Sequence, residues 1–310
     1  MNDSSIIQQP APYRNFVRAI LAWYRRHGRS LPWRNISHPY RILVSEFMLQ
    51  QTQVSRVLEK YPSFLLRFPT LRSLAEAPRR EVILAWDGLG YNNRAVRLHE
   101  CAKTLLHRYR GTLPTSYEEL VRLPGIGPYT ANALLVSVHR RPVAVVDVNV
   151  QRVLSRVFWR MPSLDAVQDA SRVAACAFAI LPRRRAYDWT QAMMDLGATI
   201  CLARNPRCGA CPVASLCRSR GAMLRSIGRR TSGERTFDGL PNRIYRGRVV
   251  TYLRKNKKPC SAIRIARAVR PTFAHSHASW FVALLKKLER DGLIRLYGNG
   301  TLKTMRVSLA

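Results

Sequence analysis

The chain of 310 residues carries 52 Lys and Arg against 18 Asp and Glu, which gives a net charge of +34. This length is enough for two domains with a core each, and the charge predicts attraction to a polyanion, nucleic acid before a membrane surface. The longest apolar run, Val173 to Leu181, is about half of the ~18 residues that a membrane-spanning helix needs, and Met1 to Pro10 lacks a signal-peptide layout. We therefore expect no membrane association and a cytoplasmic, nucleoid-associated protein.

The main body of the chain has the pattern of helices. Apolar residues recur at helical spacing, as at Phe16, Ile20 and Trp23, and alternating strand-like runs are nearly absent before residue 240. Prolines between the periodic stretches would begin or end helices. The sequence therefore predicts an all-α body.

A carboxylate on an apolar helix is the first candidate for chemistry. Glu46 lies in the segment Ser45 to Thr52, which is otherwise apolar or uncharged. One such acid could be an exposed helix residue. Its interest depends on a second acid further along the chain.

A glycine-rich turn comes next, in Leu123 to Thr130, followed by the helical run Ala131 to Val138. Gly125 and Gly127 would let the backbone approach a ligand closely, and free amides at the start of the second helix can hold a phosphate. The segment could also be a simple connector between helices.

The second acid is Asp147, which stands in an apolar stretch, and burying a carboxylate there is costly unless it is paired or catalytic. It could also cap a helix that starts near Asn149, and the two roles are compatible. Two carboxylates on either side of a sugar–base bond suit glycoside cleavage: one protonates the leaving group and the other stabilises the cation-like transition state.

Four of the seven cysteines form a compact group with the spacing Cys201-x6-Cys208-x2-Cys211-x5-Cys217. An odd total speaks against a disulfide framework and for ligation. Four thiolates on one loop can hold a [4Fe–4S] cluster or a zinc ion, and spacing alone does not decide between them.

The end of the chain has a different pattern. From Arg218 onward, 22 Lys and Arg stand against 4 Asp and Glu. Residues 221–242 are predicted as a linker, and 243–310 as a small domain with helices at 244–253, 260–269 and 275–291 and strands at 293–297 and 303–309. This order resembles a winged-helix domain, which would contact DNA or another protein.

The motifs together, in this order, resemble the endonuclease III superfamily of helix-hairpin-helix DNA glycosylases, in particular MutY-type adenine DNA glycosylases, over residues from about 12 to 220. They are Leu31-Pro32-Trp33-Arg34, Pro39-Tyr40, Ser45-Glu46 through Gln53-Val54, Gly88-Leu89-Gly90-Tyr91, Leu123 to Thr130, Val146-Asp147 with Asn149, Gln191 to Ala198 and the four cysteines.

The resemblance implies a two-lobed all-α glycosylase core over 1–220, with a small winged-helix-like domain after it. A six-helix module would span about 36–146, and a cluster module about 1–35 plus 147–220. It favours a [4Fe–4S] cluster over zinc, with Cys201, Cys208, Cys211 and Cys217 as ligands. The partner would be double-stranded DNA with a mismatch or an oxidised base, bound by a monomer.

By resemblance, Glu46 protonates the leaving adenine and later handles water, while Asp147 stabilises the sugar cation or traps it covalently. Tyr129 and Asn149 would support this pair. Gln51 and Tyr91 would wedge into the base stack, and Thr52 and Leu89 would contact the opposite base. The full set of expected DNA contacts is Arg34, Gln51, Thr52, Leu89, Tyr91, Gly125 and Gly127.

Two departures from related proteins refine the expected reaction. Lyase members of the superfamily have a nucleophilic Lys two residues after the second glycine of the hairpin, where this chain has Tyr129, so we expect a monofunctional glycosylase. Typical MutY proteins also continue into a Nudix-like domain that recognises 8-oxoguanine, and this chain has the short winged-helix-like segment instead.

The sequence favours release of adenine opposite 8-oxoguanine or guanine, and two alternatives stay open. One is a mismatch glycosylase that removes thymine or uracil opposite guanine. The other is a DNA-binding regulator with a redox-sensing cluster, against which the combination of Glu46, Asp147 and Tyr129 argues.

Overall fold

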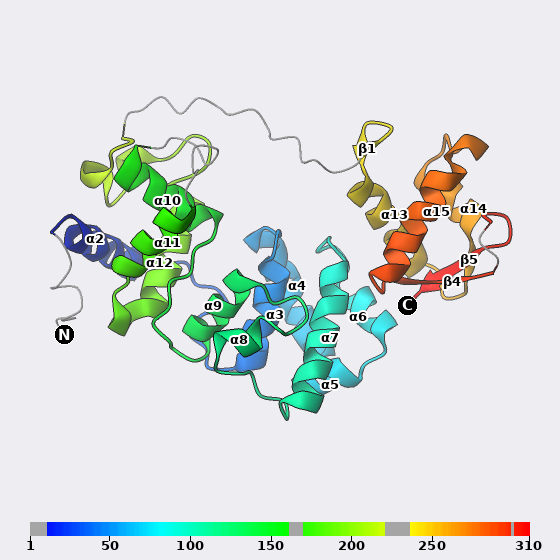
Figure 1. Cartoon of the computed structure of the whole chain (residues 1–310), viewed down its shortest axis with the longest axis horizontal. Helices are drawn as coiled ribbons and strands as arrows, with labels where there is room; N and C mark the ends of the chain where they lie inside the picture. Colours follow the sequence, from blue (N-terminus) through cyan, green and yellow to red (C-terminus); the bar gives the residue numbers. More distant parts are fainter. Residues whose placement is uncertain (1–10, 161–169, 221–235, 299–300) are drawn as a thin grey trace. The chain divides into compact units, whose positions relative to one another are not determined.

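The computed structural model describes residues 11–160, 170–220, 236–298 and 301–310 (Figure 1). The chain divides into two compact units. Unit 1 consists of Met1–Ile42, Pro114–Arg122 and Ile126–Arg230, and unit 2 consists of Leu43–Leu113, Leu123–Gly125 and Thr231–Ala310. Each unit is described by itself.

Unit 1 is helical and has one large hydrophobic core and a smaller one around Ala133, Val136 and Val145. Its first helix, α2, buries Phe16, Ile20 and Trp23, whose spacing places them on one face. Phe16 packs edge-on against Trp189 of α12, with ring centroids 5.8 Å apart. The helices of this unit are α2 (Ala11–His27), α8 (Tyr117–Leu120), α9 (Pro128–Ser137), α10 (Val148–Trp159), α11 (Ala170–Ala179) and α12 (Ala186–Thr199), with 3₁₀ turns at Arg183–Arg185, Cys208–Ala210 and Ala214–Leu216.

The first part of unit 2 is also helical. Helix α3 (Pro39–Leu49) runs from unit 1 into unit 2, and α5 and α6 both pack on α7. The remaining helices here are α4 (Val54–Arg67), α5 (Leu71–Glu76), α6 (Arg79–Ala85) and α7 (Asn93–Arg108). No strand occurs among the described residues before Thr236, so the prediction of an all-α body is confirmed.

The C-terminal segment, residues 236–310, completes unit 2 with three helices and a small sheet. The sheet is antiparallel with the strand order β3-β5-β4, and Leu296 of β4 faces Val307 of β5. The elements are β1 (Thr236–Phe237), β2 (Leu240–Pro241), α13 (Asn242–Arg254), β3 (Cys260–Ser261), α14 (Ala262–Val269), a 3₁₀ turn (His275–His277), α15 (Ala278–Arg290), β4 (Ile294–Tyr297) and β5 (Arg306–Leu309).

The structure corrects two details of the predicted C-terminal segment. The predicted linker, 221–242, is too long: residues 221–235 lie outside the described residues, but 236–241 form the β1–β2 hairpin and α13 begins at Asn242. The helix predicted to start at Cys260 starts at Ala262, because Cys260 and Ser261 pair with β5 instead.

In the described part of the chain, no helix combines the length and the apolar character that crossing a membrane requires.

Candidate active site and cluster loop

Glu46 lies near the end of α3 and is half-buried between two buried neighbours, Ser45 and Phe47. Burial raises the pKa of its carboxyl from the ordinary value of 4.5 to about 7. A carboxyl with this pKa is about half protonated at pH 7 and mostly protonated below it. It can therefore donate a proton, which is the role predicted for it.

Asp147 is the N-cap of α10, and its two oxygens are held in place. Oδ1 accepts hydrogen bonds from the backbone N–H groups of Asn149 (2.9 Å) and Val150 (2.7 Å), and Oδ2 accepts one from Asn149 Nδ2 (2.7 Å). Capping therefore does not exclude the catalytic role, because it fixes the direction of the carboxylate. The predicted partnership of Asp147 with Asn149 is a direct contact.

The orientation of Asn149 depends in turn on Arg152, one turn further along α10. Arg152 Nη2 donates to Asn149 Oδ1 (2.8 Å) and to the carbonyl oxygen of Gly197 (2.7 Å), and Nε donates to the carbonyl oxygen of Cys201 (2.8 Å). A Cβ on Gly197 would lie 2.6 Å from that of Asn149, so α12 must have a glycine there. Asp147 is thus connected to the first cysteine of the cluster loop.

The helix-hairpin-helix is formed by α8, the turn after it and α9. Gly125 has φ +80°, and a Cβ there would lie 2.6 Å from the Phe47 ring. Gly127 precedes α9 as its N-cap without a side-chain cap, and a Cβ there would meet nothing within 4 Å. The start of α9 therefore has space for a ligand beside Gly127, and a helix N-terminus favours an anion. Tyr129, in the first turn of α9, is half-buried and donates its hydroxyl to Met194 Sδ at 3.8 Å.

Two loops of unit 2 carry the predicted wedge residues. Gln51 (φ +56°) and Tyr91 (φ +41°) both have left-handed backbone conformations and exposed side chains. Such strain in residues other than glycine is typical of functional sites, because the surrounding structure must hold it.

The guanidinium of Arg94 holds both loops together. Its Nη1 donates to the carbonyl oxygens of Phe47 and Met48 (both 2.9 Å), and its Nη2 donates to Thr52 Oγ1 (2.8 Å) and to the carbonyl oxygen of Leu89 (3.0 Å). Arg94 is 5% exposed, and burial lowers the pKa of its guanidinium to about 10.

Thr52 and Leu89 belong to the same arrangement. Thr52 Oγ1 donates to the carbonyl oxygen of Leu89 at 3.2 Å, which ties the two loops directly. The side chain of Leu89 is only 4% exposed. Contact of Leu89 with the opposite base thus stays a prediction, and in this conformation its side chain packs inside unit 2.

Arg34, which we predicted to contact DNA, has a different role in the structure. It is 7% exposed, and its two terminal nitrogens donate to the two oxygens of Asp195 at 2.8 and 2.7 Å. Arg29 joins the same fully buried carboxylate. This network lowers the pKa of Asp195 despite its burial. Arg34 therefore holds α12 to the residues after α2, and its contact with DNA stays a prediction.

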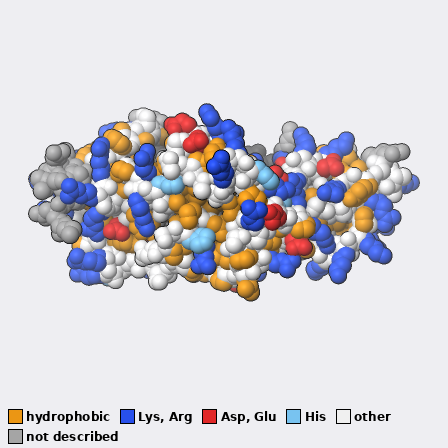
Figure 2. Space-filling view, turned by 90° about the horizontal axis from the view of Figure 1, so that it is seen from below, with side chains coloured by type: hydrophobic (Ala, Val, Ile, Leu, Met, Phe, Trp, Pro, Cys, Tyr) orange, Lys and Arg blue, Asp and Glu red, His pale blue; other side chains and the backbone are white. Residues whose placement is uncertain are grey.

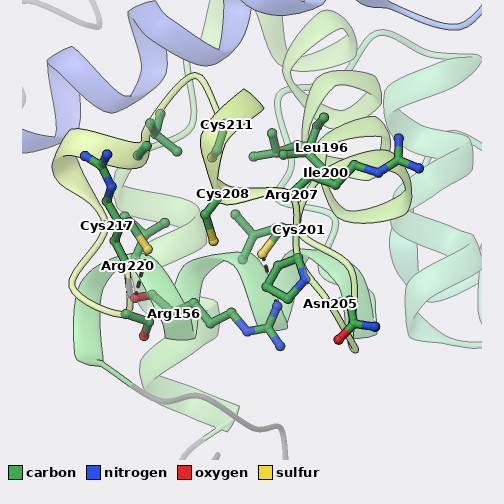
Figure 3. Close-up of a pocket in the computed structure, with 16 residues that line it drawn as sticks. Arg156, Leu196, Ile200, Cys201, Asn205, Arg207, Cys208, Cys211, Cys217 and Arg220 are labelled. Carbon is green, nitrogen blue, oxygen red and sulfur yellow. Dashed lines mark hydrogen bonds between the residues drawn. The ribbon is translucent and has the colours of Figure 1, made fainter. Parts of the chain in front are cut away.

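The four predicted cysteine ligands surround one cavity of about 330 Å³ in unit 1 (Figure 3). No three His, Cys, Asp or Glu side chains in the described ranges are close enough to hold a single metal ion. The sulfurs of Cys201, Cys208 and Cys217 point toward the cavity in Figure 3. The lining also includes apolar side chains and three arginines, Arg156, Arg207 and Arg220. Four thiols in such a cavity fit an iron–sulfur cluster.

Arg156 fixes the loop around this cavity. Its Nη1 donates to Cys201 Sγ at 3.5 Å and to the carbonyl oxygen of Leu202 at 2.6 Å, while Nη2 donates to the carbonyl oxygen of Ala203 at 2.9 Å. The Cys217 thiol donates to the carbonyl oxygen of Arg156 at 3.6 Å. The hydrogen bond to Cys201 Sγ is one that a thiolate ligand would strengthen.

Sequence reasoning missed the residues that position the site: Arg94, Arg152, Arg156 and Asp195. Each is a buried charged residue in a helix, and such residues are rare unless paired. Asp195 lies within the motif Gln191 to Ala198, which gave a signal, but its partners could not be assigned from the sequence.

Comparisons with known proteins agree with this geometry. Residues 44–174 match the family model described as the HhH-GPD superfamily base excision DNA repair protein, and residues 201–217 match the iron-sulfur binding domain of endonuclease III. The four cysteines therefore form the site of a [4Fe–4S] cluster.

Named relatives cover more of the chain. A protein named "Adenine DNA glycosylase" from Mycobacterium tuberculosis is 46% identical over 63% of this chain, and the match covers 64% of that protein's length. Another of the same name, from Mycolicibacterium smegmatis, is 40% identical over 79% of this chain and 83% of its own length.

Among solved structures, one titled as a thermostable thymine-DNA glycosylase superposes on 67% of this chain and 96% of its own, with a TM-score of 0.62 and 28% identity. The chain therefore belongs to the HhH-GPD superfamily of base excision DNA repair proteins, in the family of the adenine DNA glycosylases.

Proposed function

We propose that the protein is a monofunctional DNA glycosylase that releases a mispaired adenine, opposite 8-oxoguanine or guanine. The observation that carries this proposal is Glu46, a half-buried carboxyl whose pKa is raised to about 7. The names of the relatives support adenine as the released base.

The reaction requires a proton donor and a fixed carboxylate. Glu46 would protonate a ring nitrogen of the adenine, because neutral adenine is a poor leaving group. Asp147 would face the sugar, and its orientation by two backbone amides and by Asn149 suits stabilisation of the cation that forms. Glu46, ionised after the transfer, would then accept a proton from the attacking water.

The proposal of glycosylase activity without strand cleavage rests on Tyr129. Cleavage through a covalent imine needs an amine nucleophile at this hairpin position. Tyr129 has a phenol there, and it donates its hydroxyl to Met194 Sδ at 3.8 Å. The abasic product should therefore stay intact.

Binding to double-stranded DNA is supported by charge and by the hairpin. On the face that Figure 2 shows, Lys and Arg side chains far outnumber Asp and Glu. The start of α9, with space beside Gly127, suits a phosphate. The cluster would order the loop from Cys201 to Cys217, because hydrolysis of an N-glycosidic bond needs no electron transfer. We propose further a cytoplasmic monomer, the module boundaries given above and a DNA-contacting winged helix in the C-terminal segment.

The test is single-turnover base release from four duplexes that contain A·8-oxoguanine, A·G, T·G and U·G pairs. Glu46→Gln and Asp147→Asn proteins are measured in parallel, with iron content and DNA affinity as controls for folding. Adenine release by the wild-type protein, reduced at least 100-fold by both substitutions, is the expected result.

Thymine or uracil opposite guanine is the second candidate substrate, since the superposed structure is titled a thymine-DNA glycosylase. Release of thymine or uracil without adenine would establish this activity instead. Release from none of the four duplexes, with a sequence-specific footprint, would favour a DNA-binding regulator.

A further inference from the structure

The C-terminal segment shares a hydrophobic core with the first part of unit 2. Ile83 of α6 and Val96 of α7 are buried in the same cluster as Val250 of α13 and Leu288 of α15. At Gly292, after α15, a Cβ would lie 3.2 Å from Val96 Cγ1. The two parts of unit 2 are therefore packed together.

Arg254, at the end of α13, joins the segment to the loop that contains Tyr91. It donates to the carbonyl oxygen of Ile83 at 3.0 Å and to Asn92 Oδ1 at 2.9 Å, and it forms an ion pair with Asp87. Burial lowers the pKa of this guanidinium. The loop from Asp87 to Asn92 is thus held at both ends by one side chain of the C-terminal segment.

A cavity of about 510 Å³ lies between this loop and helices α13 and α15. Three cations line it, Arg243 and Arg246 from α13 and Lys287 from α15, and Asp291 is the one acidic residue of its described lining. Tyr91, which is 46% exposed, contributes an aromatic ring to the lining. The cavity therefore has an excess of positive charge.

Arg246 carries a donor that the fold leaves unused. Its Nη2 is paired with Asp291, while its Nη1 is buried with no hydrogen-bond partner in the described structure. A buried donor without a partner is rare in folded proteins, and a ligand with an acceptor oxygen would satisfy it. The described lining has three cationic side chains and one acidic side chain, and this balance of charge favours an anionic ligand.

We propose that this cavity binds a phosphodiester of the DNA backbone, beside the Asp87–Asn92 loop. The C-terminal segment is then part of the DNA-binding surface, and it acts through backbone contact without reading sequence. The assignment rests on the proposed function only in taking DNA as the substrate.

The test compares two pairs of substitutions in the full-length, cluster-loaded protein. Arg243→Ala with Lys287→Ala removes two exposed cations from the cavity. Arg264→Ala with Arg267→Ala removes two exposed cations of α14 that do not line it. Affinity for a duplex is measured between 50 and 300 mM salt. The cavity pair should weaken binding about tenfold and reduce the salt slope by about 1, as expected for one lost phosphate contact, and the α14 pair should change the slope much less.

A duplex scan with one neutral methylphosphonate at a time locates the contact. At one position, the methylphosphonate should weaken DNA binding by the wild-type protein about tenfold and leave DNA binding by the cavity variant unchanged. The proposal would be overturned if both pairs of substitutions changed the salt slope equally. It would also be overturned if no methylphosphonate position weakened binding of the wild-type protein without weakening binding of the cavity variant. A third result would also overturn it: inorganic phosphate at constant ionic strength displaces DNA from the wild-type protein in a saturable way, and does not do so from the cavity variant. The cavity would then be a site for a free anion.

These binding measurements need no base release. Failure of every duplex to release a base would remove the proposed glycosylase activity without affecting the cavity assignment. Normal base release, together with no phosphate position that depends on the cavity, would remove the cavity assignment without affecting the proposed glycosylase activity.

Discussion

The role proposed for Glu46 predicts a definite direction for the pH dependence of the reaction. Because the pKa of its carboxyl is raised to about 7, the acid form that donates a proton is abundant below that value and is lost above it. The single-turnover rate of adenine release should be nearly level from pH 5.5 to 6.5 and should fall about tenfold per unit above pH 7.5. A rate that rises through pH 7 would mean that the ionised form of Glu46 acts in the rate-limiting step.

The same carboxyl should cost stability at alkaline pH. In the unfolded chain it titrates near 4.5 and in the fold near 7, so the protonated form favours folding and this advantage is lost as pH rises through 7. Glu46→Gln should therefore raise the free energy of unfolding by about 1 to 3 kcal/mol at pH 8 and by little at pH 4.5.

Thermal unfolding at the two pH values measures this effect. The control is Glu59→Gln, because the Glu59 side chain is 66% exposed and forms an ion pair with the neighbouring Lys60. An equal gain in both proteins at pH 8 would assign the effect to net charge alone.

Arg152 should act on catalysis through Asn149 and Asp147. Arg152→Gln removes the hydrogen bonds that connect Asn149, and through it Asp147, to Cys201. If Asp147 has the proposed role, single-turnover release should slow by about 10- to 100-fold, the usual effect of a misplaced catalytic group. Iron content and DNA affinity are measured beside the rate. A loss of rate that only accompanies loss of iron would show that Arg152 serves the cluster loop and not the carboxylate.

The two acids proposed to act in catalysis could be singled out from the sequence, because an acid in an apolar stretch is visible there. Their supports could not, since Arg94 and Arg152 contact carbonyl oxygens of residues 46 and 49 positions away. Arg34 shows the same limit. Its motif was recognised, but its partner Asp195 lies 161 residues away, so the sequence did not reveal the buried ion pair.

At the scale of elements, the helices followed from apolar spacing and prolines, and Asp147 correctly marked the start of α10. The short strands did not follow. Two residues at Cys260–Ser261 have no periodicity of their own, and they become a strand only because β5 lies beside them. The β1–β2 hairpin is equally short, with Asp238 and Gly239 at its turn as the one local signal.

The loops that carry Gln51 and Tyr91, the two predicted wedge residues, are held together by Arg94. Arg94→Met removes its hydrogen bonds to Phe47, Met48, Thr52 and Leu89 and leaves buried carbonyl oxygens without donors. The expected cost is about 2 to 4 kcal/mol in the free energy of unfolding. At temperatures where the variant is folded, DNA affinity should fall as well, because Gln51 and Tyr91 lose their common support. Chemical denaturation and duplex binding measure the two effects, and unchanged duplex affinity in the folded variant would contradict this role.

At the scale of the whole molecule, the cysteine loop was predicted from the sequence and the attachment of the C-terminal segment was not. The cysteine spacing alone placed all four sulfurs around one cavity. The attachment of the C-terminal segment was hidden, because it depends on Ile83 and Val96, two ordinary apolar residues of an early helix pair. A linker rich in glycine and arginine suggested an appended domain, whereas the structure joins the segment to the helices that hold the wedge loop.

This attachment predicts that a change in α6 is felt in α13 and α15. Ile83 is fully buried in the shared core, so Ile83→Ala should lower the free energy of unfolding by about 2 to 4 kcal/mol. It should also speed amide hydrogen exchange in Asn242–Arg254 and Ala278–Arg290. The matched control is Leu74→Ala, a fully buried position on α5 outside that core. Its cost should be similar, with exchange in the two C-terminal helices closer to wild type. If both variants leave exchange in α13 and α15 unchanged, the C-terminal segment folds on its own, and the loop that carries Tyr91 does not depend on it.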